Sequence, residues 1–144
     1  MDAPPPYDGD LLDRLRDEKA ALLVLQADRL LFRSMAPGVK PLLELVDRFP
    51  QGIPGATAVD RMVGACAARV FVMLQFGRVV AETMSAPGRE ILVQADMPFS
   101  FRRLIPEVRN RDNTDVCPFE KMSGQHSETP GLIQAIRRRF GLNA

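Results

Sequence analysis

The sequence predicts an α/β domain in which a mixed β-sheet carries helices on its faces. Two short apolar runs near the start, joined by a two-residue link, are typical of a β-hairpin. Further along, strand-like runs alternate with runs of helical periodicity, and strands joined through a crossover helix run parallel. The 144 residues suffice for one hydrophobic core and leave no room for a second domain of ordinary size. We therefore expect a hairpin first, a mixed sheet, and a helical C-terminal tail.

The N-terminal part is predicted to contain a short helix and the hairpin. Prolines at positions 4–6 favour an extended start, and residues 9–19 then have the leucine spacing of a surface helix. The apolar runs 21–26 and 29–33 are the two predicted strands. Ala27-Asp28 is the link between them, and its length is the one that tight hairpins use.

Two core helices are predicted next. Apolar residues recur at helical spacing over residues 42–49, between two proline-containing breaks. Thr57, followed three residues later by Asp60, resembles a capping box with a shorter acid. An almost wholly apolar helix is therefore predicted from about Ala58 to Phe76, and we expect it to be the central helix, covered on several sides.

The remaining elements alternate between strand and helix. Residues 78–84 and 99–105 are predicted strands, and a helix capped by Ser85 runs between them to about Ala95. Short helices are predicted over 118–122 and from Thr129 onwards, which gives the order ββααβαβ followed by a helical tail. We divide the chain into an N-terminal extension with its short helix (residues 1–19), an α/β domain (20–125) and a C-terminal amphipathic helix packed on it (126–144).

The composition excludes several classes of protein. The 19 basic and 18 acidic side chains almost cancel, so we do not expect nucleic acid as a partner. The first residues lack the pattern of a signal peptide, and no apolar stretch reaches the length of a membrane span, so we expect no membrane contact and a cytoplasmic location. Cys66 and Cys117 fit neither a zinc-site spacing nor a disulfide framework.

The stretch from Asn110 to Glu120 is the most informative candidate site, because it combines a thiol, carboxylates and a guanidinium in a segment too polar for the core. Cys117 is the best candidate nucleophile, since a thiol next to a helix N-terminus has a lowered pKa. Asp112 or Glu120 would then carry the proton. Other readings stay open: Cys117 can be a buried apolar residue, and Glu120 a first-turn acid. Asn110 and Asp112 can be turn residues.

The start of the predicted central helix offers a second candidate, a site for an anion. Helix N-termini present free amide groups and a partial positive charge, and Arg61 would add a full charge in the first turn. Two simpler readings compete with this one. Asp60 can cap the helix, and Arg61 can be a solvated surface residue.

Three separated segments resemble one known family. They are Lys40-Pro41-Leu42-Leu43, Asp60-Arg61-Met62-Val63-Gly64 with the alanines that follow, and the stretch from Asn110 to Glu120. Together they resemble the prokaryotic family catalogued as domain of unknown function 1893, over about residues 22–122. That resemblance implies a cytidine-deaminase-like three-layer fold. The family usually has lysine at the positions of Arg61 and Ala65. The positive charge is therefore retained at position 61, as arginine, and is lost at position 65.

The resemblance to deaminases does not extend to their zinc site. Zinc deaminases need a His or Cys two residues before a Glu, and a Pro-Cys-x-x-Cys motif at the next helix start. This chain has Val59-Asp60-Arg61 and Ala86-Pro87-Gly88-Arg89 at the corresponding places, and its only histidine is His126. We therefore expect no zinc, no metal site and no zinc-dependent deaminase activity, and the sequence identifies no cofactor.

Three functional hypotheses follow. The leading one is a non-zinc domain that binds a small anionic metabolite, such as a nucleotide. Its candidate ligand-binding residues are Asp60, Arg61, Gly64, Asn110, Arg111 and Asp112. The second hypothesis is a thiol-dependent enzyme that uses Cys117 with Asp112 or Glu120. The third is an interaction module that forms a homo-oligomer through a sheet edge or the central helix. Whether the chain is an enzyme stays open.

Overall fold

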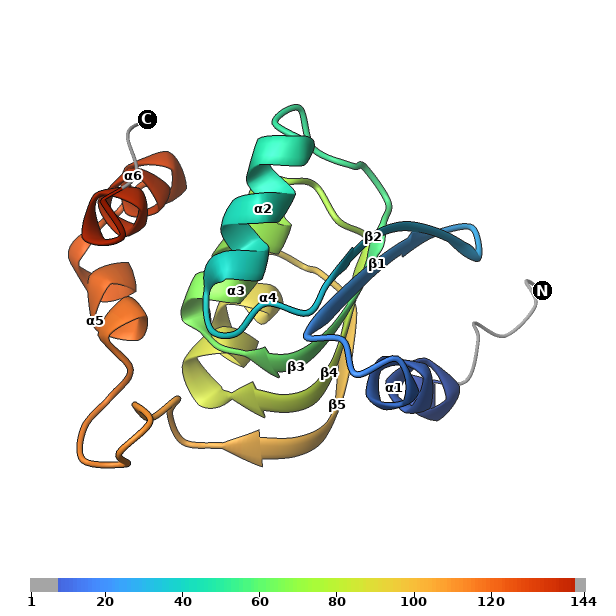
Figure 1. The fold of residues 1–144 in the computed structure, drawn as a ribbon, viewed down its shortest axis with the longest axis horizontal. Helices are drawn as coiled ribbons and strands as arrows, with labels where there is room; N and C mark the ends of the chain where they lie inside the picture. The colour runs from blue at the N-terminus through green and yellow to red at the C-terminus, as the bar shows by residue number, and fades with distance from the viewer. Residues whose placement is uncertain (1–7, 142–144) are drawn as a thin grey trace.

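The structure, a computed structural model, describes residues 8–141 as five strands and six helices (Figure 1). In chain order these are α1 (Asp8–Asp17), β1 (Leu22–Gln26), β2 (Arg29–Ser34), α2 (Lys40–Arg48), β3 (Thr57–Val63), α3 (Ala65–Met73), β4 (Arg78–Ser85), α4 (Ala86–Gln94), β5 (Phe99–Ile105), α5 (Pro118–Gln125) and α6 (Thr129–Arg139). The predicted extended start at prolines 4–6 lies outside the described residues.

The strands form one mixed sheet in the order β2-β1-β3-β4-β5. Strand β1 pairs antiparallel with both β2 and β3, whereas β3, β4 and β5 run parallel to one another. The helices α3 and α4 are the crossover connections that parallel neighbours require. The predicted α/β fold with a mixed sheet, a leading hairpin and a helical tail is confirmed. Its likeness to cytidine deaminases stays a prediction.

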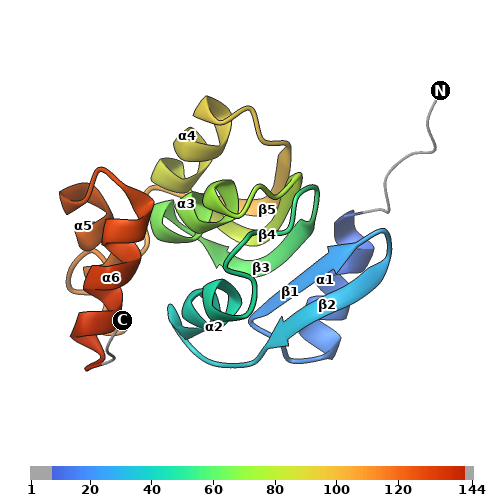
Figure 2. The same ribbon diagram turned by 90° about the horizontal axis from the view of Figure 1, so that it is seen from above.

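The helices are distributed unequally over the two faces of the sheet. Helix α1 lies alone on one face, α2, α3 and α4 cover the other, and α5 and α6 lie beyond them (Figure 1 and Figure 2). The larger apolar core therefore lies between the sheet and α2, α3 and α4, and it includes buried side chains of α6. A smaller core lies under α1 and is formed by Leu12, Leu15, Ala20, Leu23, Leu25, Val59 and Val80.

The predicted hairpin is confirmed, with its turn at the predicted link. Ala27 and Asp28 have φ angles of 49° and 66°, and positive φ at both central residues is the geometry of a type I′ turn. Gln26 pairs directly with Arg29 across that turn. Because this turn matches the twist of paired strands, the two-residue link was a sound signal for the hairpin.

The predicted helix from Ala58 to Phe76 is wrong in its first third. Residues 57–63 form β3, which lies between β1 and β4 in the middle of the sheet, and the helix α3 begins only at Ala65. A central strand is covered on both faces, so its apolar run lacks the alternation that identifies most strands. Asp60 and Arg61 therefore lie on a strand and not in the first turn of a helix.

The predicted cap of α4 is confirmed. The Ser85 hydroxyl accepts a hydrogen bond from the backbone N–H of Gly88 at 3.1 Å, and Pro87 occupies the first turn. Gly88 also allows a close approach of α4 to the end of β3, because a Cβ atom there would lie 2.7 Å from the carbonyl oxygen of Val63. The starts of α3 and α4 are thus packed against each other at the carboxyl ends of the parallel strands.

The Ser85→Ala variant is expected to lose about 1 kcal/mol of unfolding free energy, because a buried N-cap hydroxyl is removed from α4. Urea unfolding of the purified variant measures this loss. Ser127→Ala is the matched control, since Ser127 is exposed and no described residue hydrogen-bonds its side chain. An equal loss in both variants would contradict a specific capping role for Ser85.

The two C-terminal helices are anchored to the body of the domain through α3 and α2. The Arg69 guanidinium of α3 donates a hydrogen bond to the carbonyl oxygen of Ser123 at 2.7 Å. In α6, Leu132, Ile133 and Ile136 are buried in the larger core, and Arg137 forms an ion pair with Asp47 of α2. Helix α6 therefore carries the amphipathic face that its sequence predicts.

Candidate functional site

The start of α3 is capped by a carboxylate from a distant part of the chain. The two Glu120 oxygens accept hydrogen bonds from the backbone N–H groups of Ala65 at 2.7 Å and Cys66 at 2.9 Å. Gly64 makes room for this carboxylate, because a Cβ atom on Gly64 would lie 2.3 Å from one of its oxygens. The structure thus brings the end of the predicted loop to a helix start, but that start is Ala65 and not the predicted one near Ala58. The two amide groups, however, already hold an anion, which is the side chain of Glu120.

Both cysteines lie near this capping carboxylate. Cys66, in the first turn of α3, is buried, and Cys117 is the half-buried N-cap residue of α5. Burial, with smaller contributions from the nearby Glu120 and Cys117, raises the pKa of the Cys66 thiol to about 12. The Cys66 thiol is therefore protonated at neutral pH and inert, in keeping with a packing role. The role of Cys117 as a nucleophile stays a prediction.

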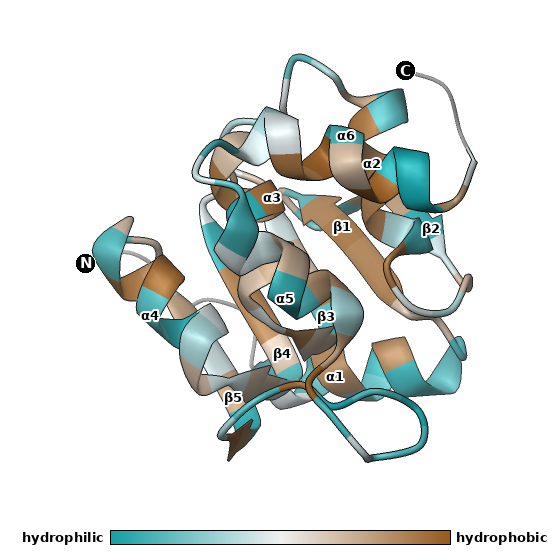
Figure 3. Ribbon diagram, turned by 90° about the vertical axis from the view of Figure 1, so that its left-hand side faces the viewer, coloured by the Kyte–Doolittle hydropathy of each residue, from teal (hydrophilic) through white to brown (hydrophobic). Residues whose placement is uncertain are grey.

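The loop from Asn110 to Asp115 is hydrophilic, lies between β5 and α5, and is closed by its own hydrogen bonds (Figure 3). The Asn110 side chain accepts from the backbone N–H of Thr114 at 2.9 Å and donates to the Thr114 hydroxyl at 3.1 Å. These contacts give Asn110 a turn role. Arg111 and Asp112 are exposed, and no side-chain hydrogen bond or ion pair connects them to another residue of the range 8–141. Their ligand-binding role stays a prediction.

Asp60 is a buried carboxyl in the middle of β3, where only 9% of the residue is exposed. Its carboxyl accepts a hydrogen bond from the backbone N–H of Met62 at 3.2 Å, and it forms no ion pair with another described residue. Burial raises the pKa of Asp60 to about 7, and the backbone hydrogen bonds and Arg61 offset this only in part. Asp60 is thus an acid that titrates near neutral pH, not a helix cap.

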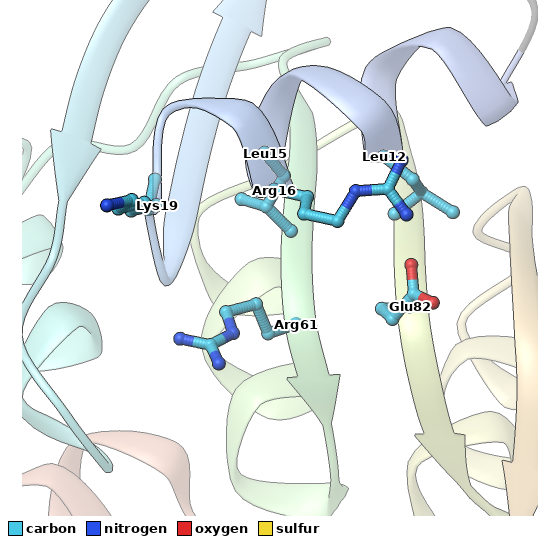
Figure 4. A pocket seen from close by; sticks show the side chains of 7 residues that line it. Leu12, Leu15, Arg16, Lys19, Arg61 and Glu82 are labelled. Carbon is cyan, nitrogen blue, oxygen red and sulfur yellow. The ribbon is translucent and has the colours of Figure 1, made fainter.

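Arg61 follows Asp60 but points to the other side of the sheet, because successive side chains of a strand alternate between its faces. The backbone N–H of Arg61 donates to the carbonyl oxygen of Ala21 at 3.2 Å, so the end of the α1–β1 connection lies beside it. Its side chain faces α1 (Figure 4). No hydrogen bond or ion pair connects Arg61 with the predicted loop in the described part of the chain. The structure therefore does not bring the predicted ligand-binding residues together in one place.

An open cavity of about 350 Å³ lies between α1 and the sheet. We call it the α1 cavity. Seven residues line it, from α1, the segment after its C-terminal end, β3 and β4. They are Leu12, Leu15, Arg16, Lys19, Ala20, Arg61 and Glu82 (Figure 4). The leucines form its apolar wall. Figure 4 shows Lys19 and Arg61 toward one end of the cavity and Arg16 and Glu82 toward the other.

The charges of the α1 cavity are compensated at one end only. Arg16 pairs with Asp13 at 2.9 Å. Asp13 also pairs with Arg102 at 3.1 Å, and Arg102 pairs with Glu82 at 3.2 Å. These four side chains form a chain of alternating charge whose sum is zero. Lys19 and Arg61 have no carboxylate partner among residues 8–141, so their end of the cavity carries two uncompensated positive charges.

The sequence pointed to Arg61 but missed its neighbours. Lys19, Arg16 and Glu82 join it only because α1 crosses the sheet above β3 and β4. One local signal was present. Arg16 lies four residues after the core residue Leu12 of α1, at the edge of its buried face. That spacing places Arg16 beside the sheet, but it does not identify the strand that Arg16 faces. Lys19 lies beyond the end of α1 with a φ of 55°, so helical spacing does not place it.

Within residues 8–141, no three side chains of the types His, Cys, Asp and Glu come together in a way that could hold a metal ion. None of the described helices combines the length and the apolar composition needed to cross a membrane.

Comparison with known families identifies the domain. The family described as domain of unknown function DUF1893 matches residues 11–140, which is most of the chain. The chain belongs to the DUF1893 family. The predicted resemblance is therefore confirmed, and the match extends beyond the segments that carried it, from within α1 to the end of α6.

This DUF1893 domain also resembles a solved structure. The crystal structure of a DUF1893 family protein from Thermotoga maritima is similar to it, with a TM-score of 0.83 and 25% sequence identity. The similarity covers 96% of this chain and 93% of the other. No curated protein matches the chain. The family name assigns no activity.

Proposed function

We propose that this DUF1893 domain binds a small anionic metabolite, and that the ligand occupies the α1 cavity. One observation carries the proposal: Lys19 and Arg61 come from different elements, line the same cavity, and have no carboxylate partner within residues 8–141. Most of the other cations near α1, Arg14, Arg16, Arg33, Arg78 and Arg102, are in ion pairs. An anion would supply the charge that these two side chains lack.

The surroundings of Lys19 and Arg61 strengthen their attraction for an anion, compared with two cations fully surrounded by water. Lys19 and Arg61 are exposed, but the buried Leu12 and Leu15 form the wall behind the cavity, so apolar groups replace part of the solvent on that side. Charges beside apolar groups interact more strongly than charges fully surrounded by water. The volume of the cavity, about 350 Å³, lies at the small end of the roughly 300–1,000 Å³ typical of ligand pockets.

The start of α3, which the sequence suggested as the anion site, is the weaker location. Its free N–H groups at Ala65 and Cys66 donate to Glu120, so a ligand anion would have to displace a carboxylate that is held by two hydrogen bonds. Arg61 still binds the anion in this proposal. The site, however, lies on the opposite face of the sheet, in the α1 cavity and not at the start of α3.

Arg61→Ala and Lys19→Asn are each expected to weaken the binding of small anions up to about fivefold, because a partly exposed ion pair contributes up to about 1 kcal/mol. Asn is chosen at position 19 because Lys19 has a φ of 55°, which Asn tolerates better than most residues. Calorimetric titration with inorganic pyrophosphate at low salt measures the Kd. A higher salt concentration should weaken binding further through charge screening.

Arg89→Ala is the matched control, because Arg89 is an exposed arginine on α4, has no ion pair with a described residue and lies on the other side of the sheet. It should bind pyrophosphate as the wild-type protein does. The proposal fails if Arg61→Ala and Lys19→Asn bind the anion as tightly as Arg89→Ala does, or if no small anion binds the folded protein.

A further inference from the structure

We infer that the ligand of the α1 cavity is a phosphate monoester of a small polyhydroxylated molecule, that is, a sugar phosphate, and not a nucleotide. This inference rests on the proposed function and adds the chemical class of the ligand. It follows from three properties of the cavity, which are the surplus of charge at one end, the acceptor at the other end, and the side chains in between.

The surplus charge matches a phosphate monoester. Arg16, Asp13, Arg102 and Glu82 neutralise one another, so the net excess among the lining side chains and their ion-pair partners is that of Lys19 and Arg61. A phosphate monoester carries a charge of about −1.5 to −2 at neutral pH. A single carboxylate would leave one of the two cations uncompensated. An arginine is also suited to phosphate, since its guanidinium presents several N–H donors in one plane.

Glu82 fits the hydroxyl groups of a sugar. Its Oε2 pairs with Arg102 at 3.2 Å, whereas its Oε1 has no hydrogen-bond partner among the described residues. An ionised carboxylate oxygen only accepts hydrogen bonds, so this end of the cavity offers an acceptor to a hydroxyl donor. The phosphate is thereby directed to Lys19 and Arg61, and the hydroxyl groups to Glu82, because the two ends of the cavity differ in charge (Figure 4).

The lining of the cavity does not suit a nucleobase. None of its seven lining side chains is aromatic, and the apolar ones are aliphatic residues of α1 and its C-terminal end (Figure 4). Proteins that hold bases commonly stack them on aromatic rings, and the cavity offers no such ring. Its volume of about 350 Å³ also favours a compact ligand, since sites for larger ligands extend to about 1,000 Å³.

The test is a titration of the wild-type protein and of Glu82→Ala with four probes at low salt. The probes are ribose 5-phosphate, inorganic phosphate, ribonate and AMP, and the readout is the calorimetric Kd. In the wild-type protein, ribose 5-phosphate should bind about fivefold more tightly than inorganic phosphate, because hydroxyl hydrogen bonds are added. Ribonate, a sugar acid with several hydroxyl groups but only one negative charge, should bind about fivefold more weakly than ribose 5-phosphate. The adenine base of AMP should add no binding affinity.

The Glu82→Ala variant should lose the preference for ribose 5-phosphate over inorganic phosphate while still binding inorganic phosphate. Arg89→Ala should retain the preference. The inference is overturned if AMP binds more tightly than ribose 5-phosphate, if ribonate binds as well as the phosphate, or if Glu82→Ala keeps the sugar preference. These results would leave anion binding intact, whereas the absence of any Arg61-dependent anion binding would instead overturn the proposed function itself.

Discussion

The Asp60→Asn variant is expected to be more stable than the wild-type protein at about pH 8, by roughly 3–5 kcal/mol. Burial raises the pKa of Asp60 from 3.8 to about 7, so above that pH the folded protein must hold an ionised carboxylate in an apolar place. Asparagine has nearly the same shape and no charge to desolvate, and its side-chain oxygen can still accept from the Met62 N–H.

The sign of the pH dependence follows from the direction of the pKa shift. The folded state holds the proton of Asp60 more tightly than the unfolded state, so the contribution of the neutral carboxyl is fully present below about pH 4. It is lost as the pH rises to about 7, and it changes no further at higher pH. In Asp60→Asn this decline should vanish, and the two proteins should have similar stability at about pH 4.

Urea unfolding at several pH values between about 4 and 8 measures this effect as a difference between two curves. Asp112→Asn is the control, because Asp112 is exposed and no side-chain contact connects it to another described residue. Its curve should run parallel to that of the wild-type protein. Two results would show that Asp60 is not held neutral by burial. One is a wild-type stability that does not fall over this pH range, and the other is an Asp60→Asn variant that is less stable than the wild-type protein at high pH.

The parts of the fold that the sequence predicted correctly are those with local signals. The hairpin has a link of two residues that adopt positive φ, α4 has its own Ser85 cap, and α6 has an amphipathic pattern that it buries in the core. Each of these signals lies within one element or at its boundary, so no knowledge of the tertiary structure was needed.

The error at β3 has a physical cause. Strand β3 is covered on both faces, and the equally apolar helix α3 follows it after a single residue, Gly64. The residues of β3 and α3 therefore form one continuous apolar run in the sequence. A run of that length predicts a single buried helix. The capping signal at Thr57 and Asp60 strengthened that error. Asp60 is a buried strand residue instead, and the true cap of the helix comes from Glu120, more than fifty residues away.

The α1 cavity was beyond prediction for a different reason. Arg61 was recognised as a candidate, but its partners depend on the direction in which α1 crosses the sheet, and on the strand alternation that separates Arg61 from Asp60. Both depend on packing between elements distant in sequence. A correct assignment of β3 would have placed Arg61 on the face opposite Asp60, although it would not have identified the helix on that face.

The Glu120→Ala variant is expected to lose about 1–3 kcal/mol of unfolding free energy, because two N–H groups at the start of α3 lose a charged acceptor. Gly64→Ala should cost a similar amount in the wild-type protein, since its Cβ atom would lie 2.3 Å from a Glu120 oxygen and would displace the carboxylate. Urea unfolding of the two variants gives both losses.

The combination of the two substitutions makes the test specific. With Glu120→Ala already present, Gly64→Ala should cost nothing or even stabilise the protein by about 0.4–1 kcal/mol, because the side chain of alanine restricts the unfolded chain. Gly64 has φ −98° and ψ −168°, which is extended backbone that alanine adopts readily. Glu120→Gln is the conservative control. It removes the charge but keeps one accepting oxygen, so its loss should be smaller than that of Glu120→Ala.

Additive costs of Gly64→Ala and Glu120→Ala would show that the glycine and the carboxylate do not act through one contact. A Gly64→Ala effect that is destabilising alone and absent with Glu120→Ala would show instead that the carboxylate fits against the glycine as a built-in anion at the start of α3. The start of α3 would then be a structural joint between α3 and α5, with its anion-binding capacity already used. The two uncompensated cations of the α1 cavity would remain as the place where the domain can bind an anion from solution.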